Sequence, residues 1–408
     1  MSSKTWIEIS KKNLLHNVGQ LLKLLKPETQ FMAVVKSNAY GHGLREVTRI
    51  LSKSNSGKKC HTGNYGTFCP VWFGVDNLDE AKVVREIAPK SPVLVLGYTQ
   101  EARLREAAKL GARITVYNWE TVKALKSLNR RGQATPARGL ALNASLRVHV
   151  KVETGTTRQG IGSPPAGGEA VEFINALKKI KGVEVEGIST HFADSEDLRS
   201  NYALGQITRY NSVLEALKQA GIEIPVHHTA CTAATLRLPQ AHGNLVRVGI
   251  GMYGLWPSEE VKMQNAELRM KNDRIELKPV LTWKTIVAQV KEVKKGTPVS
   301  YDLTERVTRD SKIAVLPVGY WDGFDRGLSK IGHVLIGGKR CKIVGRVCMN
   351  MCMADITGIR GVKPEDEVVL LGQQGRGEVS AEEIAKNLGT INYEVITRIN
   401  TMLPRVVR

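Results

Sequence analysis

The sequence lacks the long apolar runs of membrane proteins and is poor in cysteine and proline. No apolar run reaches the roughly 18 residues that a membrane-spanning helix needs, and residues 1–6 show none of the features of a secretory signal. The 6 cysteines lie mostly in apolar, strand-like segments, which is typical of buried free thiols in a reducing compartment. With 15 prolines and 42% apolar residues in 408, the chain is expected to form a packed core. These features predict a cytoplasmic protein with no membrane partner.

Acidic residues are outnumbered, with 39 Asp and Glu against 59 Lys and Arg, a formal net charge of +20. The basic residues are spread along the chain, and no zinc-finger spacing or other nucleic-acid-binding module is recognisable. We therefore expect a generally basic surface and no specific nucleic-acid partner. Nucleic-acid binding stays as an alternative that rests on the net charge alone and would weaken with salt.

Short apolar runs rich in β-forming residues alternate with amphipathic helical stretches through the first 250 residues or so. The runs are 31–36, 72–75, 92–97, 113–118, 147–153, 183–191, 226–230 and 245–251. Strand–helix units in this number and spacing predict an α/β fold, a (β/α)8 TIM barrel. A doubly wound open sheet is the alternative, but no G-x-G-x-x-G follows an early strand.

The pattern changes after about residue 276, where helical stretches give way to strands and glycine-bearing turns. The strand-like runs are 281–293, 312–317, 333–336, 341–347, 351–356 and 367–371. One helix follows, announced by Ser380 and Glu383 in the spacing of a capping box. We expect a barrel over residues 12–268 and a separate C-terminal all-β domain over 269–408, joined near the charged segment 266–277.

Polar residues stand at or near the C-terminal ends of the predicted barrel strands. They are Lys36, Lys151 with Glu153, His191, Thr229 and Arg247. Each position alone is an ordinary place for a polar side chain to emerge from a strand. Because barrel enzymes assemble their active sites at this end, the set as a whole predicts a site at the barrel mouth.

The most specific segment is 33–43, which reads AVVKSNAYGHG. Lys36 ends a buried strand, which is costly unless the amine is paired or covalently occupied. Pyridoxal phosphate occupies such an amine as a Schiff base, although a lysine that only extends its ammonium to solvent would also fit. The segment closely resembles the cofactor-lysine motif of bacterial alanine racemases, fold-type III pyridoxal-phosphate enzymes. The resemblance runs along the chain to 391–394 (INYE).

The resemblance implies a barrel followed by a β domain. It also implies that the N-terminal segment 1–11 contains a strand, near 5–10, that joins the β domain. It further implies a head-to-tail homodimer whose active sites are shared between subunits. The implied activity is the interconversion of L-alanine and D-alanine, a small-molecule isomerisation that supplies D-alanine for peptidoglycan and the cell wall.

The resemblance also assigns roles to individual residues. It makes Lys36 and Tyr301 of the partner subunit the two catalytic bases. The cofactor-binding residues by the same likeness are Lys36, Tyr40, His191, Thr232, Arg247, Gly249, Ile250 and Tyr393. Arg158 and Met349 are similar to substrate-binding residues, and Tyr393 also lies at the substrate pocket by this resemblance. Lys151 is similar to a lysine that is carbamylated in many members.

Elementary chemistry agrees with these roles. Hydroxyls and backbone N–H groups suit a dianionic phosphate. Arg247 at the pyridine nitrogen would donate a hydrogen bond without giving up its proton, leaving the ring nitrogen unprotonated and favouring α-proton exchange over transamination. Racemisation needs a base on each face of the α-carbon. For Tyr301 and His191 considered alone, ordinary core packing would be the commoner explanation.

Some positions depart from the family pattern. Asp302 follows Tyr301 where glycine is usual, Asn350 replaces an aspartate, and Cys231 replaces an asparagine. The segment 54–70 looks longer than usual and contains Cys60, His61 and Cys69, too few ligands for a zinc site, so we expect a solvated loop and no metal.

Other activities within this fold type stay open. A racemase of serine or of several amino acids is the nearest alternative. A decarboxylase of basic amino acids would place a carboxylate where Arg247 stands. A non-catalytic cofactor-binding barrel would lack the β domain and Tyr301.

Overall fold

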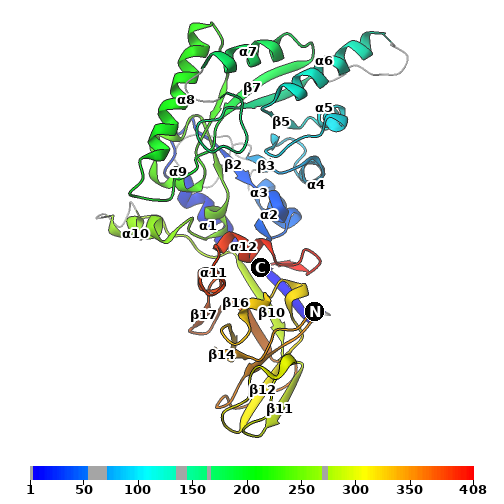
Figure 1. Cartoon of the computed structure of the whole chain (residues 1–408), viewed down its shortest axis with the longest axis vertical. Coiled ribbons are helices and arrows are strands. Elements are labelled where there is room, and N and C mark those ends of the chain that lie inside the picture. Colours follow the sequence, from blue (N-terminus) through cyan, green and yellow to red (C-terminus); the bar gives the residue numbers. More distant parts are fainter. Residues whose placement is uncertain (1–2, 54–70, 135–144, 163–166, 269–273) are drawn as a thin grey trace. The chain divides into compact units, whose positions relative to one another are not determined.

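The computed structural model describes residues 3–53, 71–134, 145–162, 167–268 and 274–408, in two compact units (Figure 1). The barrel unit comprises Leu15–Ser37 and Val47–Leu277, and the β unit comprises Met1–Leu14, Asn38–Glu46 and Lys278–Arg408. The loop expected at 54–70, with its cysteines and histidine, lies outside the described residues. Among the residues that are described, no three His, Cys, Asp or Glu side chains converge as metal ligands.

Parallel strands form one sheet in the described part of the barrel unit, in the order β8-β7-β6-β5-β4-β3-β2-β9. They are β2 (Gln30–Val34), β3 (Trp72–Val75), β4 (Val93–Val95), β5 (Arg113–Val116), β6 (Leu146–Lys151), β7 (Val183–Ser189), β8 (Val226–His228) and β9 (Leu245–Val248). At the seam between β8 and β9, the amide of Asn244 donates to the carbonyl of His227 (3.1 Å) and that of Arg247 to the carbonyl of Ala230 (3.0 Å). The sheet therefore curls into a barrel, as predicted.

Helices cover the outside of this barrel (Figure 1). They are α1 (Lys11–Leu22), α3 (Leu44–Lys53), α4 (Leu78–Ile87), α5 (Leu104–Leu110), α6 (Trp119–Ala134), α7 (Gly167–Lys178), α8 (Tyr202–Gln219), α9 (Thr232–Arg237) and α10 (Glu259–Glu267). Their ends follow local chemistry. Asn77 caps α4 by accepting from the amides of Asp79 and Glu80 at 3.0 Å, and Gly111 ends α5 with φ of 63°.

The barrel interior is filled by side chains in layers, not by a channel. One buried apolar cluster consists of Met32, Trp72, Leu94, Val226 and Leu245. His228 and Arg247 each follow a member of this cluster by two positions. Since side chains of a strand alternate between its faces, both point into the interior as well. Polar side chains therefore share the barrel interior with this apolar cluster.

The β unit contains an extended sheet in the order β11-β12-β15-β14-β13-β16-β10-β1-β18, with β17 paired to β16. Its strands are β1 (Thr5–Ile9), β10 (Leu281–Ile286), β11 (Gln289–Val293), β12 (Ser311–Leu316), β13 (His333–Ile336), β14 (Lys339–Val344), β15 (Cys352–Asp355), β16 (Glu367–Gln374), β17 (Gly377–Val379) and β18 (Arg405–Val407). β1 pairs antiparallel with β10 and parallel with β18. The first and last strands of the chain are thus neighbours in one sheet.

The single run expected at 281–293 is two strands, which corrects the sequence-based prediction. β10 pairs with β1 and β16, whereas β11 pairs with β12. Between them, Val287 donates to the carbonyl of Asp366 and Ala288 to that of Val315. The chain changes partners at this point, and the consecutive apolar residues Ile286, Val287 and Ala288 made the two strands look like one run.

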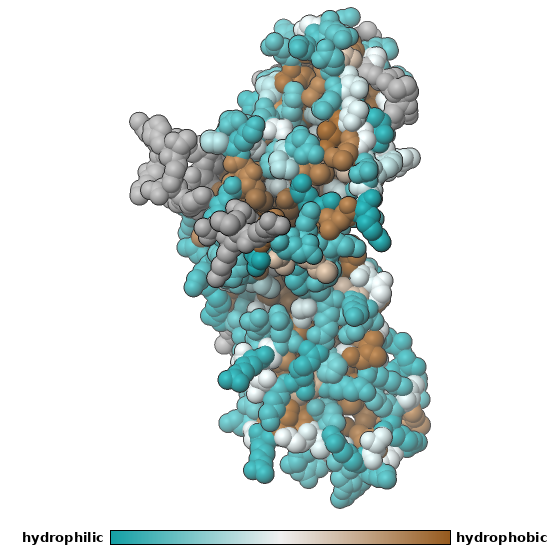
Figure 2. Space-filling model, turned by 90° about the vertical axis from the view of Figure 1, so that its left-hand side faces the viewer, coloured by the Kyte–Doolittle hydropathy of each residue, from teal (hydrophilic) through white to brown (hydrophobic). Residues whose placement is uncertain are grey.

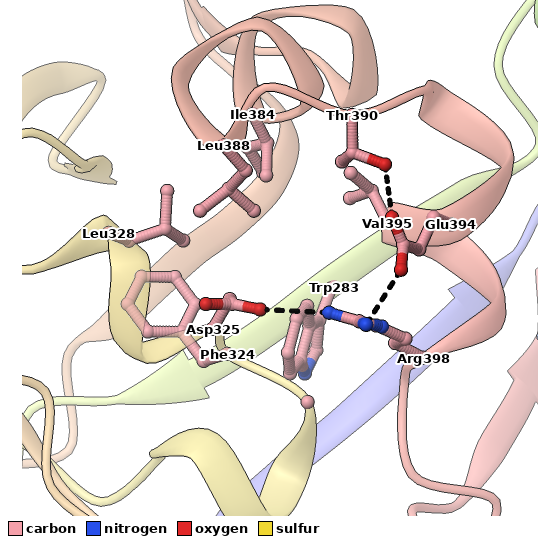
Figure 3. A pocket seen from close by; sticks show the side chains of 11 residues that line it. Trp283, Phe324, Asp325, Leu328, Ile384, Leu388, Thr390, Glu394, Val395 and Arg398 are labelled. Atoms are coloured by element: carbon pink, nitrogen blue, oxygen red, sulfur yellow. Dashed lines mark hydrogen bonds and ion pairs between the residues drawn. The ribbon is translucent and has the colours of Figure 1, made fainter.

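Two short helices, α11 (Ala381–Leu388) and α12 (Asn392–Thr397), pack in the β unit. The predicted cap at Ser380 is confirmed, because its hydroxyl accepts from the amide of Glu383 at 3.1 Å. The helices enclose a small apolar pocket with Trp283 and Phe324 at its base (Figure 3). Arg398 stands at this pocket between Asp325 (3.2 Å) and Glu394 (2.6 Å).

Hydrophilic side chains dominate the face seen in the space-filling view, with apolar side chains in scattered groups (Figure 2). None of the helices formed by the described residues combines the length and the apolarity that crossing a membrane requires.

Candidate active site

The residues predicted for the site divide between the two units. Lys36, Lys151, Arg158, His191, Thr232, Arg247, Gly249 and Ile250 belong to the barrel unit, and Tyr40, Tyr301, Met349 and Tyr393 belong to the β unit. Within the barrel unit, the charged members stand close enough to one another to shift each other's ionisation.

Lys36 follows β2 and begins a short helix, α2 (Lys36–Tyr40), that is left-handed. The φ angles from Ser37 to Tyr40 are 53–55°, although none of these residues is glycine. Left-handed helical turns cost about 1–2 kcal/mol per residue, so the surroundings must hold this one. Asn38 does so by accepting from the amide of Leu44 (2.8 Å) through its side chain and from that of Gly43 (2.9 Å) through its carbonyl.

Lys151 ends β6, and its amine donates to Oε1 of Gln159 at 3.1 Å. Burial, together with the nearby charges of Arg247 and Arg158, lowers the pKa of Lys151 to about 7. A large fraction of this amine is therefore neutral at physiological pH. A neutral, nucleophilic amine is the form that can add to carbon dioxide.

Arg247 lies on β9 and is 8% exposed. Its Nη1 donates to the carbonyl of His228 (2.5 Å), and its Nη2 donates to those of Thr190 (2.8 Å) and Thr229 (2.9 Å). Burial lowers the pKa of Arg247 to about 10, so the guanidinium stays charged at neutral pH. Both terminal nitrogens have acceptors within the described part of the barrel, whereas the Nε–H has none there and remains for a ligand.

His191 is a neighbour of this guanidinium, with Nδ1 3.3 Å from Nη2 of Arg247. Burial and the charges of Arg247 and Lys151 lower the pKa of His191 well below its usual value. The imidazole is therefore neutral at physiological pH. It can pack on a ligand ring without adding a second positive charge.

A small cradle forms where α9 begins. The hydroxyl of Thr232 accepts from the amides of Gly249 (3.1 Å) and Gly251 (3.4 Å), and Ile250 lies between these glycines. A Cβ on Gly251 would come within 2.7 Å of the Thr232 methyl group. Glycine at 251 therefore lets Thr232 approach this backbone, and its hydroxyl, which accepts there, can still donate its own hydrogen. A hydroxyl donor beside a run of backbone amides fits a phosphate group.

Thr229, which was predicted to lie at the barrel mouth, has a structural contact, since its hydroxyl donates to the carbonyl of Ala241 at 2.5 Å. This contact ties the end of β8 to the following segment. Cys231, at the position of the expected asparagine, has its sulfur 3.3 Å from the hydroxyl of Ser195. It joins two loops beside the cradle.

In the β unit, Tyr301 is 69% exposed, so it is not a core residue. It lies in a turn where Ser300 and Asp302 have φ of 67° and 63°. Arg346 holds this turn, because its carbonyl accepts from the Ser300 hydroxyl (2.8 Å) and its Nε lies 2.7 Å from Asp302. The carboxylate that departs from the family pattern therefore has an ionic partner.

The remaining predicted residues of the β unit are Met349, which is exposed, and Tyr40 and Tyr393, which are partly buried. Met349 is 56% exposed and Asn350 follows it on the surface. The rings of Tyr40 and Tyr393 have their centroids 6.2 Å apart at an interplanar angle of 48°. They form an aromatic pair next to the left-handed turn that follows Lys36.

The sequence-based prediction missed a group of polar residues in the barrel interior, of which Arg113, His149 and His228 are buried and Glu186 is partly buried. A signal was present in the run 147–153, where Arg147, His149, Lys151 and Glu153 alternate and so share one face of a strand. Only the last two were selected, because they stand at the strand end.

Comparisons with known proteins agree over the whole chain. The family model described as "Alanine racemase, N-terminal domain" matches residues 9–62 and 69–257, and that described as "Alanine racemase, C-terminal domain" matches 280–407. The alanine racemase of Methanococcus maripaludis is 35% identical over 406 residues, covering 100% of this chain and 99% of the relative. That of Carboxydothermus hydrogenoformans is 37% identical over 401 residues, covering 98% of each.

Solved structures give the same result. The alanine racemase of Bacillus anthracis, with bound L-Ala-P, has a TM-score of 0.86 at 33% identity and covers 100% of this chain and 96% of that one. A histidine racemase from Leuconostoc mesenteroides has a TM-score of 0.83 at 25% identity, covering 100% and 98%. From the matched domains and the full-length relatives together, we conclude that the chain belongs to the alanine racemase family and is an amino-acid racemase.

Proposed function

We propose that this protein interconverts L-alanine and D-alanine with pyridoxal phosphate, as a cytoplasmic homodimer that supplies D-alanine for peptidoglycan. Residues 12–268 would bind the cofactor, and residues 269–408 with the N-terminal strand would complete the site. The observation that supports this most is Arg247, a buried guanidinium with its terminal nitrogens satisfied and its Nε–H left over. It occurs in a chain that is 35% identical, over its full length, to an alanine racemase.

The residues of the barrel mouth fit the cofactor. Thr232 with the amides of Gly249 and Ile250, assisted by Tyr40 and Tyr393, would hold the phosphate and ring, and His191 would pack on the ring. Bound pyridoxal phosphate supplies an aldehyde that captures amines and an electron-withdrawing ring that acidifies the α-hydrogen of an amino acid. The Nε–H of Arg247 would donate to the ring nitrogen and, being a weak acid, leave it unprotonated.

Two residues of this chain would move the proton. Lys36 Nζ would accept or deliver it on one face of the α-carbon, and the phenol oxygen of Tyr301 of the partner subunit would do so on the other. A neutral phenol is a poor base, so positive charge beside it is needed to favour the phenolate. The exposure of Tyr301 is consistent with delivery to another subunit.

The substrate carboxylate would be held by Arg158, and Met349 with Tyr393 would limit the side-chain pocket. Lys151, whose pKa burial and its cationic neighbours lower to about 7, would carry a carbamate that orients Arg158. The carbamate would change a cation beside Arg158 into an anion. This would turn repulsion between the two side chains into attraction.

A racemase for serine or for several amino acids is the second candidate. It is supported by the histidine racemase that has the same fold at a TM-score of 0.83, since its name implies a pocket for a larger side chain. The experiment that decides is an assay of the purified protein against a panel of L- and D-amino acids with chiral separation of the products. Alanine should give the highest kcat/KM, and a preference for serine, histidine or lysine would overturn the substrate assignment.

The cofactor assignment has its own test. Borohydride treatment of the purified protein with bound pyridoxal phosphate should attach the cofactor irreversibly to one lysine, and peptide mapping should find it at Lys36. Attachment at a different lysine would contradict the proposal.

Sedimentation analysis tests the homodimer. An activity assay of the Tyr301→Phe and Lys36→Ala variants mixed after purification tests the shared site. Recovered activity in the mixture is expected only if the two residues come from different subunits.

A further inference from the structure

A continuous line of polar side chains crosses the barrel interior next to the predicted cofactor site. Nη1 of Arg247 on β9 lies 3.0 Å from Nδ1 of His228 on β8. Nε2 of His228 lies 2.8 Å from Nδ1 of His149 on β6, and Nε2 of His149 lies 3.0 Å from Oε2 of Glu186 on β7. We call these four residues the interior network. The two histidines are 0% and 1% exposed, so no bulk water competes for their nitrogens.

The two ends of the interior network determine where its protons lie. Arg247 can only donate, so Nδ1 of His228 accepts and the proton of that ring is at Nε2. This Nε2–H donates to Nδ1 of His149, which leaves the proton of His149 at Nε2. From there it donates to the Glu186 carboxylate, which can only accept when ionised. Both imidazoles are therefore neutral and carry their proton at Nε2.

The ionisation of the groups agrees with this arrangement. Burial lowers the pKa of both histidines, which keeps them uncharged. Burial opposes ionisation of Glu186, but hydrogen bonds from His149 and Arg113 outweigh it and lower the pKa of the carboxyl to about 2. The network thus holds one positive end, one negative end and two neutral rings between them.

The backbone is shaped to build the interior network. Between Val148 and His149 the register of β6 and β7 shifts, so that Val148 faces Val185 and His149 faces Gly187, and Glu186 is an extra residue. Such a bulge redirects a side chain. A Cβ on Gly187 would lie 2.3 Å from Nδ1 of His149, so glycine at this position leaves the ring its place.

A second group of residues anchors the Glu186 end. Arg113 donates to both carboxylate oxygens, at 2.7 and 2.9 Å. Its guanidinium also lies over the ring of Trp72, 4.8 Å from the centroid, and Trp72 meets His149 edge to face at 5.7 Å. The bidentate pair fixes the carboxylate in position, and Trp72 restrains the two side chains that bind it, Arg113 and His149.

We propose that Glu186, His149 and His228 are positioning residues that hold Arg247 in its donor orientation toward the ring nitrogen of the cofactor and thereby favour racemisation over transamination. The inference rests on the proposed function and names part of the machinery of that same site. None of the three residues touches the reacting atoms. They act through Arg247.

The physical reason lies in the distance between the two charges. A carboxylate placed directly at the ring nitrogen would promote its protonation, which strengthens the electron sink and invites side reactions. Here two neutral imidazoles separate the Glu186 carboxylate from Arg247. The negative charge still compensates the buried guanidinium and orients it through directional hydrogen bonds, yet it stays away from the ring.

The first test reads the proton positions directly and needs no activity. Nitrogen-15 NMR of full-length protein labelled at histidine, with the signals of His149 and His228 assigned from single variants, should show both rings neutral and protonated at Nε2 near pH 7. An Nδ1-protonated form or a charged ring at either position would overturn the interior network. This measurement uses the unaltered chain, so a variant that fails to fold does not affect it.

The second test uses Glu186→Gln with Glu184→Gln as the matched control. Both residues are on β7 and lose the same charge, but Glu184 is half exposed and pairs with Arg147 at 3.4 Å. Loss of a hydrogen bond to a charged group predicts a decrease in kcat of roughly 10- to 100-fold for Glu186→Gln. The ratio of pyruvate formed to alanine racemised should rise in the same variant. The control should match the unaltered protein in both measurements.

Equal ratios of pyruvate to racemised alanine in Glu186→Gln and the unaltered protein would refute the role in reaction choice, even if kcat fell. His149→Gln provides a second variant and should raise the same ratio if the network acts through Arg247. Failure of the proposed function gives a different result, because the unaltered protein would then racemise no amino acid while the NMR experiment would still report on the network.

Discussion

Replacing Gly187 by alanine should destabilise the barrel unit, because the new methyl group has nowhere to go. The Cβ would lie 2.3 Å from Nδ1, 2.5 Å from Cε1 and 2.7 Å from Cγ of His149. Real Cβ atoms do not approach other heavy atoms so closely, and the ring is 0% exposed, so it has no free space to move into. Trp72 restrains it on another side, with ring centroids 5.7 Å apart.

The expected loss has two parts. Overpacking a well-packed interior costs about 1–3 kcal/mol. Displacing His149 also breaks its hydrogen bond to His228 or to Glu186, and a buried polar group left without its partner costs about 1–3 kcal/mol. Since a ring that moves relieves part of the clash, the two parts overlap. We expect the free energy of unfolding to fall by about 2–4 kcal/mol.

The assay is urea unfolding at equilibrium, followed by circular dichroism at a fixed concentration of protein and pyridoxal phosphate. Gly19→Ala is the matched control, since Gly19 lies inside α1 and a Cβ there meets nothing within 4 Å. That substitution should stabilise the protein by up to about 1 kcal/mol, because alanine is a better helix former. A Gly187→Ala variant within about 0.5 kcal/mol of the unaltered protein would refute the reasoning, since surface substitutions do no more than that.

Three further predictions concern the proposed site. Tyr301→Phe should remove most racemisation while the absorbance of bound cofactor stays unchanged. In deuterated water this variant should still exchange the α-hydrogen of D-alanine, and near-normal racemisation would contradict the role of the phenol. Because the pKa of Lys151 is lowered to about 7, its neutral form grows as pH rises through 7, so a carbon-13 carbamate signal from labelled bicarbonate should be stronger at pH 8 than at pH 6 and absent in Lys151→Ala. Glu186 has its pKa lowered from 4.5 to about 2 in the folded state, so its stabilisation is present above pH 4.5 and is lost as pH falls toward 2. Acid unfolding curves of Glu186→Gln should accordingly be flatter than those of the unaltered protein between pH 4.5 and 2, and parallel curves would contradict the assignment.

The local pattern of residues was enough to predict the architecture. Each of the barrel strands begins within one residue of its predicted start, from Gln30 to Leu245, because a strand buried on both faces must be a short apolar run between turn signals. The Ser380 cap was predictable for a similar reason. Its hydroxyl binds a backbone amide in the first turn of the helix that it caps, so no distant segment takes part. The interpretation of Lys36 as the cofactor lysine rests on the contiguous motif 33–43 and stays a prediction.

Contacts that the local pattern does not reveal decided the rest, some of them within one segment and some between distant segments. The left-handed turn from Ser37 to Tyr40 contains no glycine, so a positive φ could not be predicted from its residues. Asn38 and the glycines after it hold the turn in place. The break at Val287 depends on Asp366 and Val315, which are far along the chain. The turn is held by hydrogen bonds to Gly43 and Leu44, a few residues further along the chain, whereas the break depends on distant segments; in neither case does the local preference of the residues decide the conformation.

The interior network shows the difference most clearly. His149 and His228 are 79 positions apart in the sequence, and each lies in an apolar strand run, as core histidines commonly do. What makes them partners is the closure of the barrel and the one-residue bulge that brings Glu186 to His149. The sequence by itself determined which side chains each strand turns inward, because alternation is a property of the single strand. Which of those side chains meet depends on the register between strands, and only the folded barrel decides that.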